Sequence, residues 1–411
     1  MKINKHCFPN GLRLVHYEDT STQMVALNIV YDVGARDEHP EHTGFAHLFE
    51  HLMFGVSAHI PDYDTPLQLA GGENNAWTNN DITNYYLTVP KPNVETAFWL
   101  ESDRMLELAF SEQSLEVQRG VVMEEFKQRC LNQPYGDVGH LFRPLAFRVH
   151  PYRWPTIGKE LSHIEQATLD EVKSFFYRFY APNNAVLAVT GNISWDETVK
   201  LTEKWFAPIP RRDVPVRQLP QEPEQTQERR LTVERNVPLD ALFMGYHMCS
   251  REGADYYAFD ILSDILSNGR SSRLNRRLVQ EQNIFSGIDA YISGTRDAGL
   301  LQISGKPAAG VSLEQAEAAV RKELEELQRS PVDGQELEKV KNKFESTQIF
   351  GNINYLNVAT NLAWFELTGK AEDIDLEVER YRSVTTEQLH TVAQRTFCES
   401  NAVVLYYKSD K

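Results

Sequence analysis

Apolar residues in this chain recur at two different periods, which predicts a protein that mixes strands and helices. Leu12–Glu18 alternates apolar and polar side chains and Met24–Gly34 is almost continuously apolar, so we expect two strands that pair as a hairpin. Asn84–Pro90 predicts a further strand. Ser312–Gln328 instead repeats apolar residues every three or four positions behind a Ser–Gln capping box, which predicts an amphipathic helix.

The same order of elements occurs twice along the chain. A helix with a capping box begins after Thr168 and is followed by a turn and a strand at Asn184, and the segments at Thr385 and Asn401 repeat this layout at the same spacing. Between the copies, Pro208–Arg230 is rich in proline, glutamine and charge, which is typical of an extended linker. The sequence therefore predicts a duplicated chain with a connecting segment.

We expect an α+β fold made of two homologous α/β-roll domains, each an antiparallel-rich sheet covered by helices on one face. The expected boundaries are a first domain at residues 1–210, a linker at 211–228 and a second domain at 229–411.

An apolar segment of the first copy, FAHLFEHLMFG, carries two imidazoles and a carboxylate. Its apolar residues have a helical period, with Thr43 as the expected N-cap and Gly55 at the expected end. On such a helix His47 and His51 lie one turn apart on one face, with Glu50 beside them. This donor set suits zinc, and His-x-x-Glu-His is the inverted form of a zinc-protease signature.

A histidine on an apolar helix is more often a hydrogen-bonded core residue than a ligand, so the second copy provides a useful comparison. There the segment ILSDILSNG begins at Ile261 and aligns with the segment that begins at His47. His47 and His51 then correspond to Ile261 and Ile265. A helix that packs with isoleucines in one copy does not need imidazoles for packing in the other, which favours a role in chemistry.

A catalytic zinc site needs a third protein ligand. The best candidate segment is Ser114–Cys130, which has a helical period and contains the acidic pair Glu124 and Glu125. From the residues alone, either glutamate could be the ligand, and an isolated acidic pair is more often a solvated helix face.

Composition excludes several classes of partner. The chain has 411 residues and a net charge of −16, and its lack of a basic patch argues against nucleic acid. No apolar run is long enough to span a membrane, so we expect no membrane association. Its cysteines are widely spaced and no signal peptide is visible, so we expect a cytoplasmic protein, or a periplasmic one if a leader was removed.

Together, His47-x-x-Glu50-His51 and the later RGVVMEE segment resemble the pitrilysin and mitochondrial processing peptidase family of inverted-zincin metallopeptidases. The resemblance implies one Zn²⁺ per chain, with Glu125 as the third ligand and Glu124 as the fallback. It also implies a zinc endopeptidase in which Glu50 acts as the general base. The chain departs from the family at Gln118, where an auxiliary glutamate is usual.

The segment Gly71–Pro90 resembles the edge strand with which this family binds peptides. The resemblance implies that Asn75, Ala76 and Trp77 pair with the main chain of an extended peptide, with Tyr86 further along. Binding through an unpaired edge gives main-chain affinity and loose side-chain specificity. We therefore expect unfolded peptides as substrates.

One feature of active family members is missing. The arginine and tyrosine that point at the substrate carbonyl in active members fall on Val279 and Ser286 here. The resemblance thus implies the zinc-bearing subunit of a clam-shell dimer, with a homologous partner that supplies the Arg and Tyr; a homodimer is the other arrangement. The alternatives are a non-catalytic structural or assembly subunit, and a zinc-stabilised peptide-binding subunit.

Overall fold

The structure is a computed structural model that describes residues 1–410, and these residues fold as two compact units. Each unit contains segments from both halves of the sequence. Unit 1 consists of Met1–Leu131, Trp154–Pro220 and Ile349–Leu376, and unit 2 consists of Asn132–Arg153, Gln221–Gln348 and the chain from Glu377 onward.

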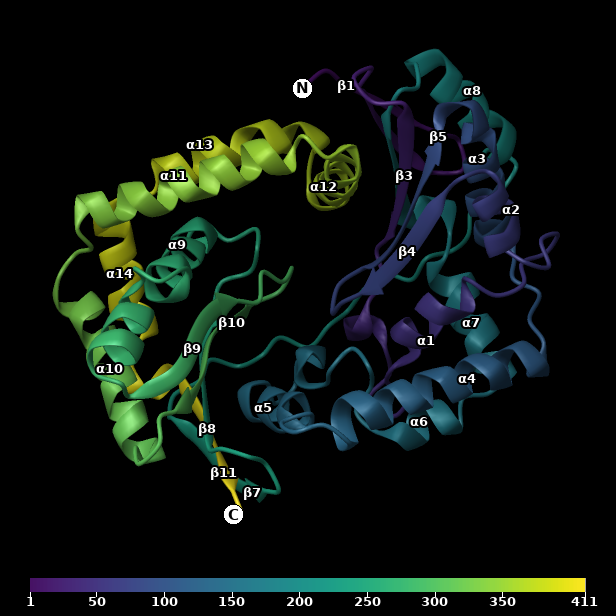
Figure 1. Ribbon diagram of the computed structural model, residues 1–411. Coiled ribbons are helices and arrows are strands. Elements are labelled where there is room, and N and C mark those ends of the chain that lie inside the picture. Colours follow the sequence, from purple (N-terminus) through teal and green to yellow (C-terminus); the bar gives the residue numbers. More distant parts are fainter. Residues whose placement is uncertain (411) are drawn as a thin grey trace. The chain divides into compact units, whose positions relative to one another are not determined.

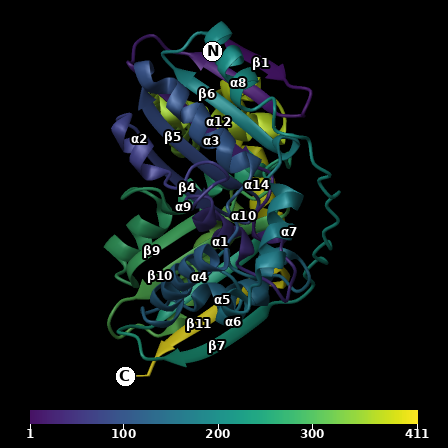
Figure 2. The same cartoon turned by 90° about the vertical axis from the view of Figure 1, so that its right-hand side faces the viewer.

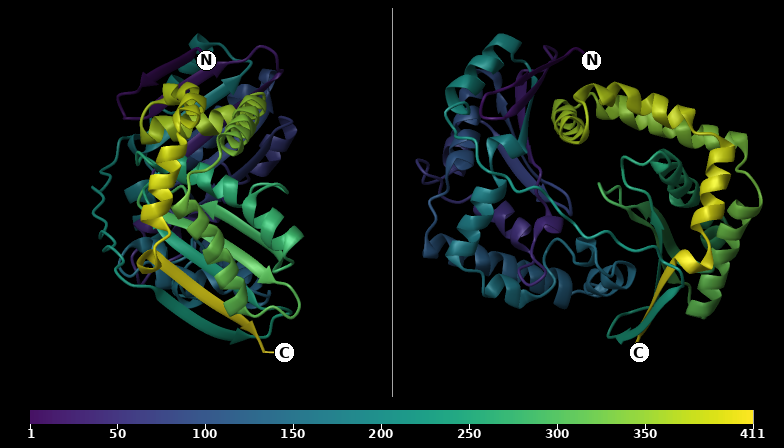
Figure 3. Two further views of the ribbon diagram at one scale, coloured as in Figure 1. Left: turned by 90° about the vertical axis from the view of Figure 1, so that its left-hand side faces the viewer. Right: turned by 180° about the vertical axis from the view of Figure 1, so that it is seen from behind.

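The units differ from the expected boundaries at 1–210, 211–228 and 229–411 in two places. Residues 132–153 of the first half belong to unit 2, and residues 349–376 of the second half belong to unit 1. The expected linker has neither helix nor strand from residue 211 to 226, and it is visible as a thin teal trace in Figures 2 and 3. Its first part, up to Pro220, belongs to unit 1.

Both units contain helices and strands (Figure 1). The elements of unit 1 are β1 (Ile3–Cys7), β2 (Arg13–Glu18), β3 (Met24–Tyr31), α1 (Phe45–Leu52), α2 (Asp64–Leu69), β4 (Glu73–Thr78), β5 (Thr83–Pro90), α3 (Val94–Leu106), α4 (Glu112–Phe126), α6 (Leu161–Glu165), α7 (Leu169–Phe179), β6 (Ala185–Gly191), α8 (Trp195–Trp205) and α12 (Tyr355–Thr368). Those of unit 2 are α5 (Val138–Ala146), β7 (Arg229–Arg235), β8 (Ala241–Met248), α9 (Tyr256–Ser267), β9 (Phe285–Ile292), β10 (Gly299–Pro307), α10 (Leu313–Arg329), α13 (Glu377–Ser383), α14 (Thr386–Thr396) and β11 (Ala402–Ser409), and α11 (Gly334–Gly351) ends just past the boundary between the units.

The sheet of unit 1 has the strand order β1-β2-β6-β3-β5-β4. The expected hairpin of β2 with β3 is wrong, because β6 lies between them, parallel to β2 and antiparallel to β3. Strand β6 is buried along its whole length, so its main-chain N–H and C=O groups need strand partners on both edges. The sheet of unit 2 has the order β7-β11-β8-β10-β9, with β11 in the position equivalent to β6.

The α+β fold is confirmed, and each sheet also has a helix on its second face. In unit 1, α12 packs its apolar side chains, such as Ala359 and Leu362, against β2, β3 and β6, on the side opposite to α3 and α8 (Figures 1 and 2). In unit 2, α5 packs Phe142 and Ala146 against Leu405 of β11. Each covering helix comes from the opposite half of the sequence, which is why a division into continuous halves misses it.

The duplication is visible in the structure. Helices α7 and α14 begin after Thr168 and Thr385, whose hydroxyls accept the N–H of Glu171 and Gln388, and each helix is followed by a buried strand. The C-terminal copy, α14 and β11, is the yellow helix and strand in the right panel of Figure 3. Among residues 1–410, no helix combines the length and apolar character needed to span a bilayer.

Candidate metal centre

Helix α1 carries the two imidazoles and the carboxylate that the sequence singles out. One face of α1 is fixed in the core of unit 1, where Leu48 and Phe49 are fully buried and the Phe49 ring stacks on that of Phe175 at 5.0 Å. His47 and His51 project from another face, with their ring centroids 4.9 Å apart. The aromatic packing therefore fixes the rotation of the helix and with it the direction of both imidazoles.

The N-terminus of α1 is capped differently from the sequence prediction. Thr43 is not the N-cap; that position is Gly44, whose φ of 89° favours glycine and which has no side chain to offer. The acceptors come from Glu38, whose two carboxylate oxygens accept the N–H groups of Gly44 and Ala46 at 2.9 and 2.8 Å. Burial raises the pKa of Glu38 to about 8, and these two N–H groups oppose the shift because they favour the charged form.

Helix α4 brings the third donor to the imidazoles. Atom Oε2 of Glu125 lies 3.4 Å from Nε2 of His47 and 3.3 Å from Nε2 of His51, and the three donor atoms lie within 4.8 Å of one another. In a tetrahedral site with metal–ligand bonds of about 2.0–2.1 Å, neighbouring donors are about 3.3–3.4 Å apart. The donor set and its spacing therefore fit a zinc ion.

The structure also distinguishes the two adjacent glutamates. The side chain of Glu124 is 62% exposed and pairs with Lys127, whereas that of Glu125 is 18% exposed and faces the imidazoles. Its other oxygen, Oε1, pairs with Arg129 one helical turn further on, at 2.7 Å. This ion pair holds the carboxylate with Oε2 directed at the histidines, as outer partners of metal ligands commonly do.

The electrostatics of the site suit metal binding and base catalysis. Burial, followed by the neighbouring His51 and Arg129, lowers the pKa of His47 to about 4 against the pull of Glu125, so this imidazole is neutral at pH 7. Burial also raises the pKa of Glu50, while the Thr78 hydroxyl and His51 lower it. A raised pKa makes the carboxylate a stronger base towards the proton of an attacking water.

Strand β4 is an edge strand, as expected, and it ends at the same site. Asn75 and Trp77 are exposed, Ala76 is half-buried, and Tyr86 of β5 pairs with Asn75 in register. The N–H of Ala76 donates to its neighbour's side-chain oxygen, Oδ1 of Asn75, at 2.8 Å, which shows that this N–H faces the open edge. Since β4 ends at Thr78, which faces Glu50, a strand added to this edge leads to the candidate base.

The C-terminal end of α1 rests on a buried ion pair. Arg104 and Glu101 are 1% and 2% exposed, Nε and Nη2 of Arg104 donate to the Glu101 carboxylate, and Glu101 also accepts the Tyr63 hydroxyl. The Arg104 guanidinium lies over the rings of Phe54 and Tyr85 at 5.3 and 4.4 Å. The Tyr85 hydroxyl in turn donates to the carbonyl of Phe49 in α1.

We predict that Arg104→Met destabilises the protein by about 3–5 kcal/mol, because it leaves the buried Glu101 carboxylate without its cation. Denaturant unfolding of the metal-free protein measures this. The double variant Glu101→Gln/Arg104→Met removes both charges and keeps an acceptor for Tyr63, so it should recover at least half of the loss. A double variant no more stable than the single one would contradict this explanation.

The positions aligned with the missing arginine and tyrosine have structural roles in unit 2. Val279 packs against the core and the Ser286 hydroxyl donates to the carbonyl of Lys306. The residues nearest to these positions that could replace the missing pair also have structural roles, because Arg277 pairs with Glu323 at 2.6 Å and Phe285 is fully buried. None of these side chains is available as a donor to a substrate carbonyl.

Sequence reasoning missed three residues that support the site. Arg129 was detectable, because it lies four residues after Glu125, the spacing of a helical ion pair. Glu38 and Arg104 gave no such signal, since Glu38 reaches α1 across a loop and Arg104 acts from a helix distant in sequence.

Two family models match different parts of this chain. The family model described as Insulinase (Peptidase family M16) matches residues 13–137, which include all four candidate site residues. The model described as Peptidase M16 inactive domain matches residues 166–344, which include none of them.

Individual relatives match almost the whole chain. Zinc protease PqqE of Helicobacter pylori is 26% identical over 405 residues, which cover 97% of this chain and 91% of that protein. The uncharacterized zinc protease YmxG of Bacillus subtilis is 25% identical over 406 residues, 98% of either chain. The crystal structure of a protease from Helicobacter pylori has a TM-score of 0.94 and 26% identity, with 99% of both chains covered.

Proposed function

Because this chain belongs to peptidase family M16, we propose that it is a zinc-dependent endopeptidase that hydrolyses unfolded peptides. The observation that carries the proposal is the convergence of His47, His51 and Glu125 within 4.8 Å beside the edge strand β4. The relatives' name of zinc protease supports the choice of metal.

In the proposed mechanism His47, His51 and Glu125 hold one zinc ion and leave a position open to substrate and water. The ion supplies Lewis acidity, which polarises the scissile carbonyl and acidifies the attacking water. Glu50 accepts the proton of that water and then passes it to the leaving amine nitrogen. Arg129 keeps the Glu125 carboxylate directed at the imidazoles throughout.

Peptide binding in this proposal is β-augmentation of β4. Main-chain groups on the open side of the strand, including the N–H of Ala76, bond to an extended peptide, and Asn75 and Trp77 contact its side chains. A folded protein does not offer a free extended segment, so the enzyme selects unfolded chains.

Replacing Ala76 by proline tests the edge. Proline removes the N–H that faces the open side, so we expect KM for an unstructured peptide to rise about tenfold, equivalent to the net contribution of a lost hydrogen bond. Zinc content should stay unchanged. The matched variant Asn75→Ala removes the side chain that occupies this N–H but keeps the N–H itself, so its KM should change less. Equal KM values for wild type and Ala76→Pro would exclude binding at this edge.

The proposal includes a partner subunit. With Val279 and Ser286 at the positions of the missing pair, neither the arginine nor the tyrosine is there to donate to the oxyanion, and one such donor typically contributes a factor of about 10²–10³ in rate. A homologous subunit without the His-x-x-Glu-His set but with the Arg and Tyr would complete the site. A clam-shell of two such chains would also restrict access by size.

The decisive experiment combines a metal assay, the mass in solution and peptide cleavage. The chain alone should bind one zinc per molecule and cleave slowly, and adding the complementary subunit should raise kcat by about 10²–10³. Full turnover by a pure monomer or homodimer would overturn the heterodimer. Zinc binding with no cleavage in either state would favour the zinc-stabilised peptide-binding subunit, and neither zinc nor cleavage would favour a structural or assembly subunit.

A further inference from the structure

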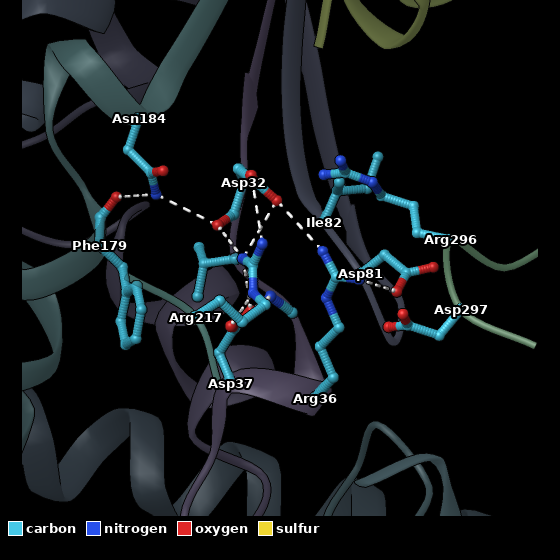
Figure 4. A network of polar contacts seen from close by, with 12 residues as sticks. Asp32, Arg36, Asp37, Asp81, Ile82, Phe179, Asn184, Arg217, Arg296 and Asp297 are labelled. Carbon is cyan, nitrogen blue, oxygen red and sulfur yellow. Dashed lines mark hydrogen bonds and ion pairs between the residues drawn. The ribbon is translucent and has the colours of Figure 1, made fainter. Parts of the chain in front are cut away.

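Arg217, in the expected linker, bonds to the loop before helix α1, and these bonds form a clasp between the two segments. Arg217 of this segment donates from Nε to Oδ1 of Asp37 at 2.6 Å, and from Nη2 to Oδ1 and the main-chain carbonyl of Asp32 at 3.1 and 2.8 Å. Figure 4 shows its guanidinium between the two carboxylates. These contacts join a residue of the linker to the end of β3 across a large distance in sequence.

Asp37 depends strongly on this clasp. Its side chain is 3% exposed, and burial raises its pKa while the bonds from Arg217 oppose the shift. Its other oxygen, Oδ2, accepts the N–H of Gly34 at 3.0 Å. A buried carboxylate that loses its cation must either take up a proton or move towards solvent.

Asp37 is adjacent to the residue that caps α1. Main-chain bonds to Asn79 and Asn80 fix the loop at Ala35 and Arg36, and the next fixed point along the chain is the Asp37 carboxylate. Glu38 follows immediately and holds the N–H groups at the start of α1. The N-cap residue of this helix is a glycine, which has no side chain with which to cap it.

We propose that Arg217 is a positioning residue for the metal centre, acting through Asp37 and Glu38 to set the N-terminal end of the helix that carries His47 and His51. The inference rests on the proposed zinc site. It makes the linker between the repeats part of the support of that site rather than a passive connection.

The experiment measures zinc affinity by competition with a chromophoric chelator, and hydrogen exchange of residues 41–52 in the metal-free protein. We expect Arg217→Ala to weaken zinc binding about tenfold, the lower end of the effect of outer-shell partners, and to speed exchange at Gly44 and Ala46. Arg217→Lys has the positive charge but cannot donate to two carboxylates as a planar guanidinium does. It should therefore recover part of the zinc affinity and part of the protection from exchange. Asp37→Asn keeps an acceptor for the N–H of Gly34 but removes the charge that pairs with Arg217. It should therefore also weaken zinc binding and speed exchange.

Arg212 offers a matched control in the same segment. It donates to the carbonyls of Tyr180 and Leu106 at 2.6 Å and does not contact the loop at residues 32–38. Arg212→Ala should therefore lower the free energy of unfolding without changing zinc affinity or exchange in α1. The proposal would be overturned if Arg212→Ala and Arg217→Ala changed zinc affinity and exchange in α1 equally. It would also be overturned if Arg217→Ala and Asp37→Asn changed neither quantity. If the wild type bound no zinc, the zinc site itself would be wrong, and the exchange measurement would still test the clasp.

Discussion

Replacing Glu50 by glutamine is expected to lower kcat for peptide cleavage by about 10²–10⁴, the usual contribution of a general base, while the protein keeps its zinc. Glutamine has nearly the same shape, but its amide cannot accept the proton of the attacking water. Peptide cleavage and zinc content measured on the same preparations check both parts of the result.

The pattern of losses identifies the role. A fall in kcat at unchanged zinc content assigns Glu50 to proton transfer, since it is not one of the three converging donors. If Glu50→Gln cleaved as fast as the wild type, Glu50 would have no part in the mechanism and the activity would come from a contaminant. Loss of zinc in this variant would instead place Glu50 among the ligands.

The second large effect concerns the ligands themselves. His51→Ala and Glu125→Ala should each remove bound zinc and reduce cleavage to the level of the chelator-treated wild type, because a catalytic site with two protein ligands no longer holds the ion. Metal analysis after dialysis, together with the cleavage assay, measures both consequences.

Two further variants of the chain serve as controls for these losses. Glu124→Gln changes the exposed neighbour of Glu125, and Asp264→Ala changes the residue of α9 that corresponds to Glu50. Both should keep zinc and activity near the wild-type level. Loss of activity in a folded Asp264→Ala protein would mean that the second copy takes part in catalysis, and loss of zinc in Glu124→Gln would reverse the assignment of the third ligand.

Local patterns predicted much of the architecture because they depend on contacts close in sequence. The capping boxes before α7 and α10, the edge-strand pattern of β4 and the isoleucines of α9 are all found where they were expected. The predicted pairing of β2 with β3 failed for the opposite reason. Which strand lies between two others is decided by long-range packing, and β6 is more than 150 residues away from β3.

The sequence by itself determined that this chain is a duplicated α+β protein, and it singled out the residues of a candidate metal centre in one copy. Periodicity and the spacing of His47, Glu50 and His51 suffice for that, because one turn of helix places the side chains. Only the tertiary structure decided that Glu125 rather than Glu124 meets the imidazoles. Adjacent residues of a helix point in different directions, and packing decides which of them faces the site. It alone also revealed Glu38 and Arg217 as supports of α1, because Glu38 reaches the helix across a loop and Arg217 comes from a segment distant in sequence. Neither contact leaves a periodic trace in the chain.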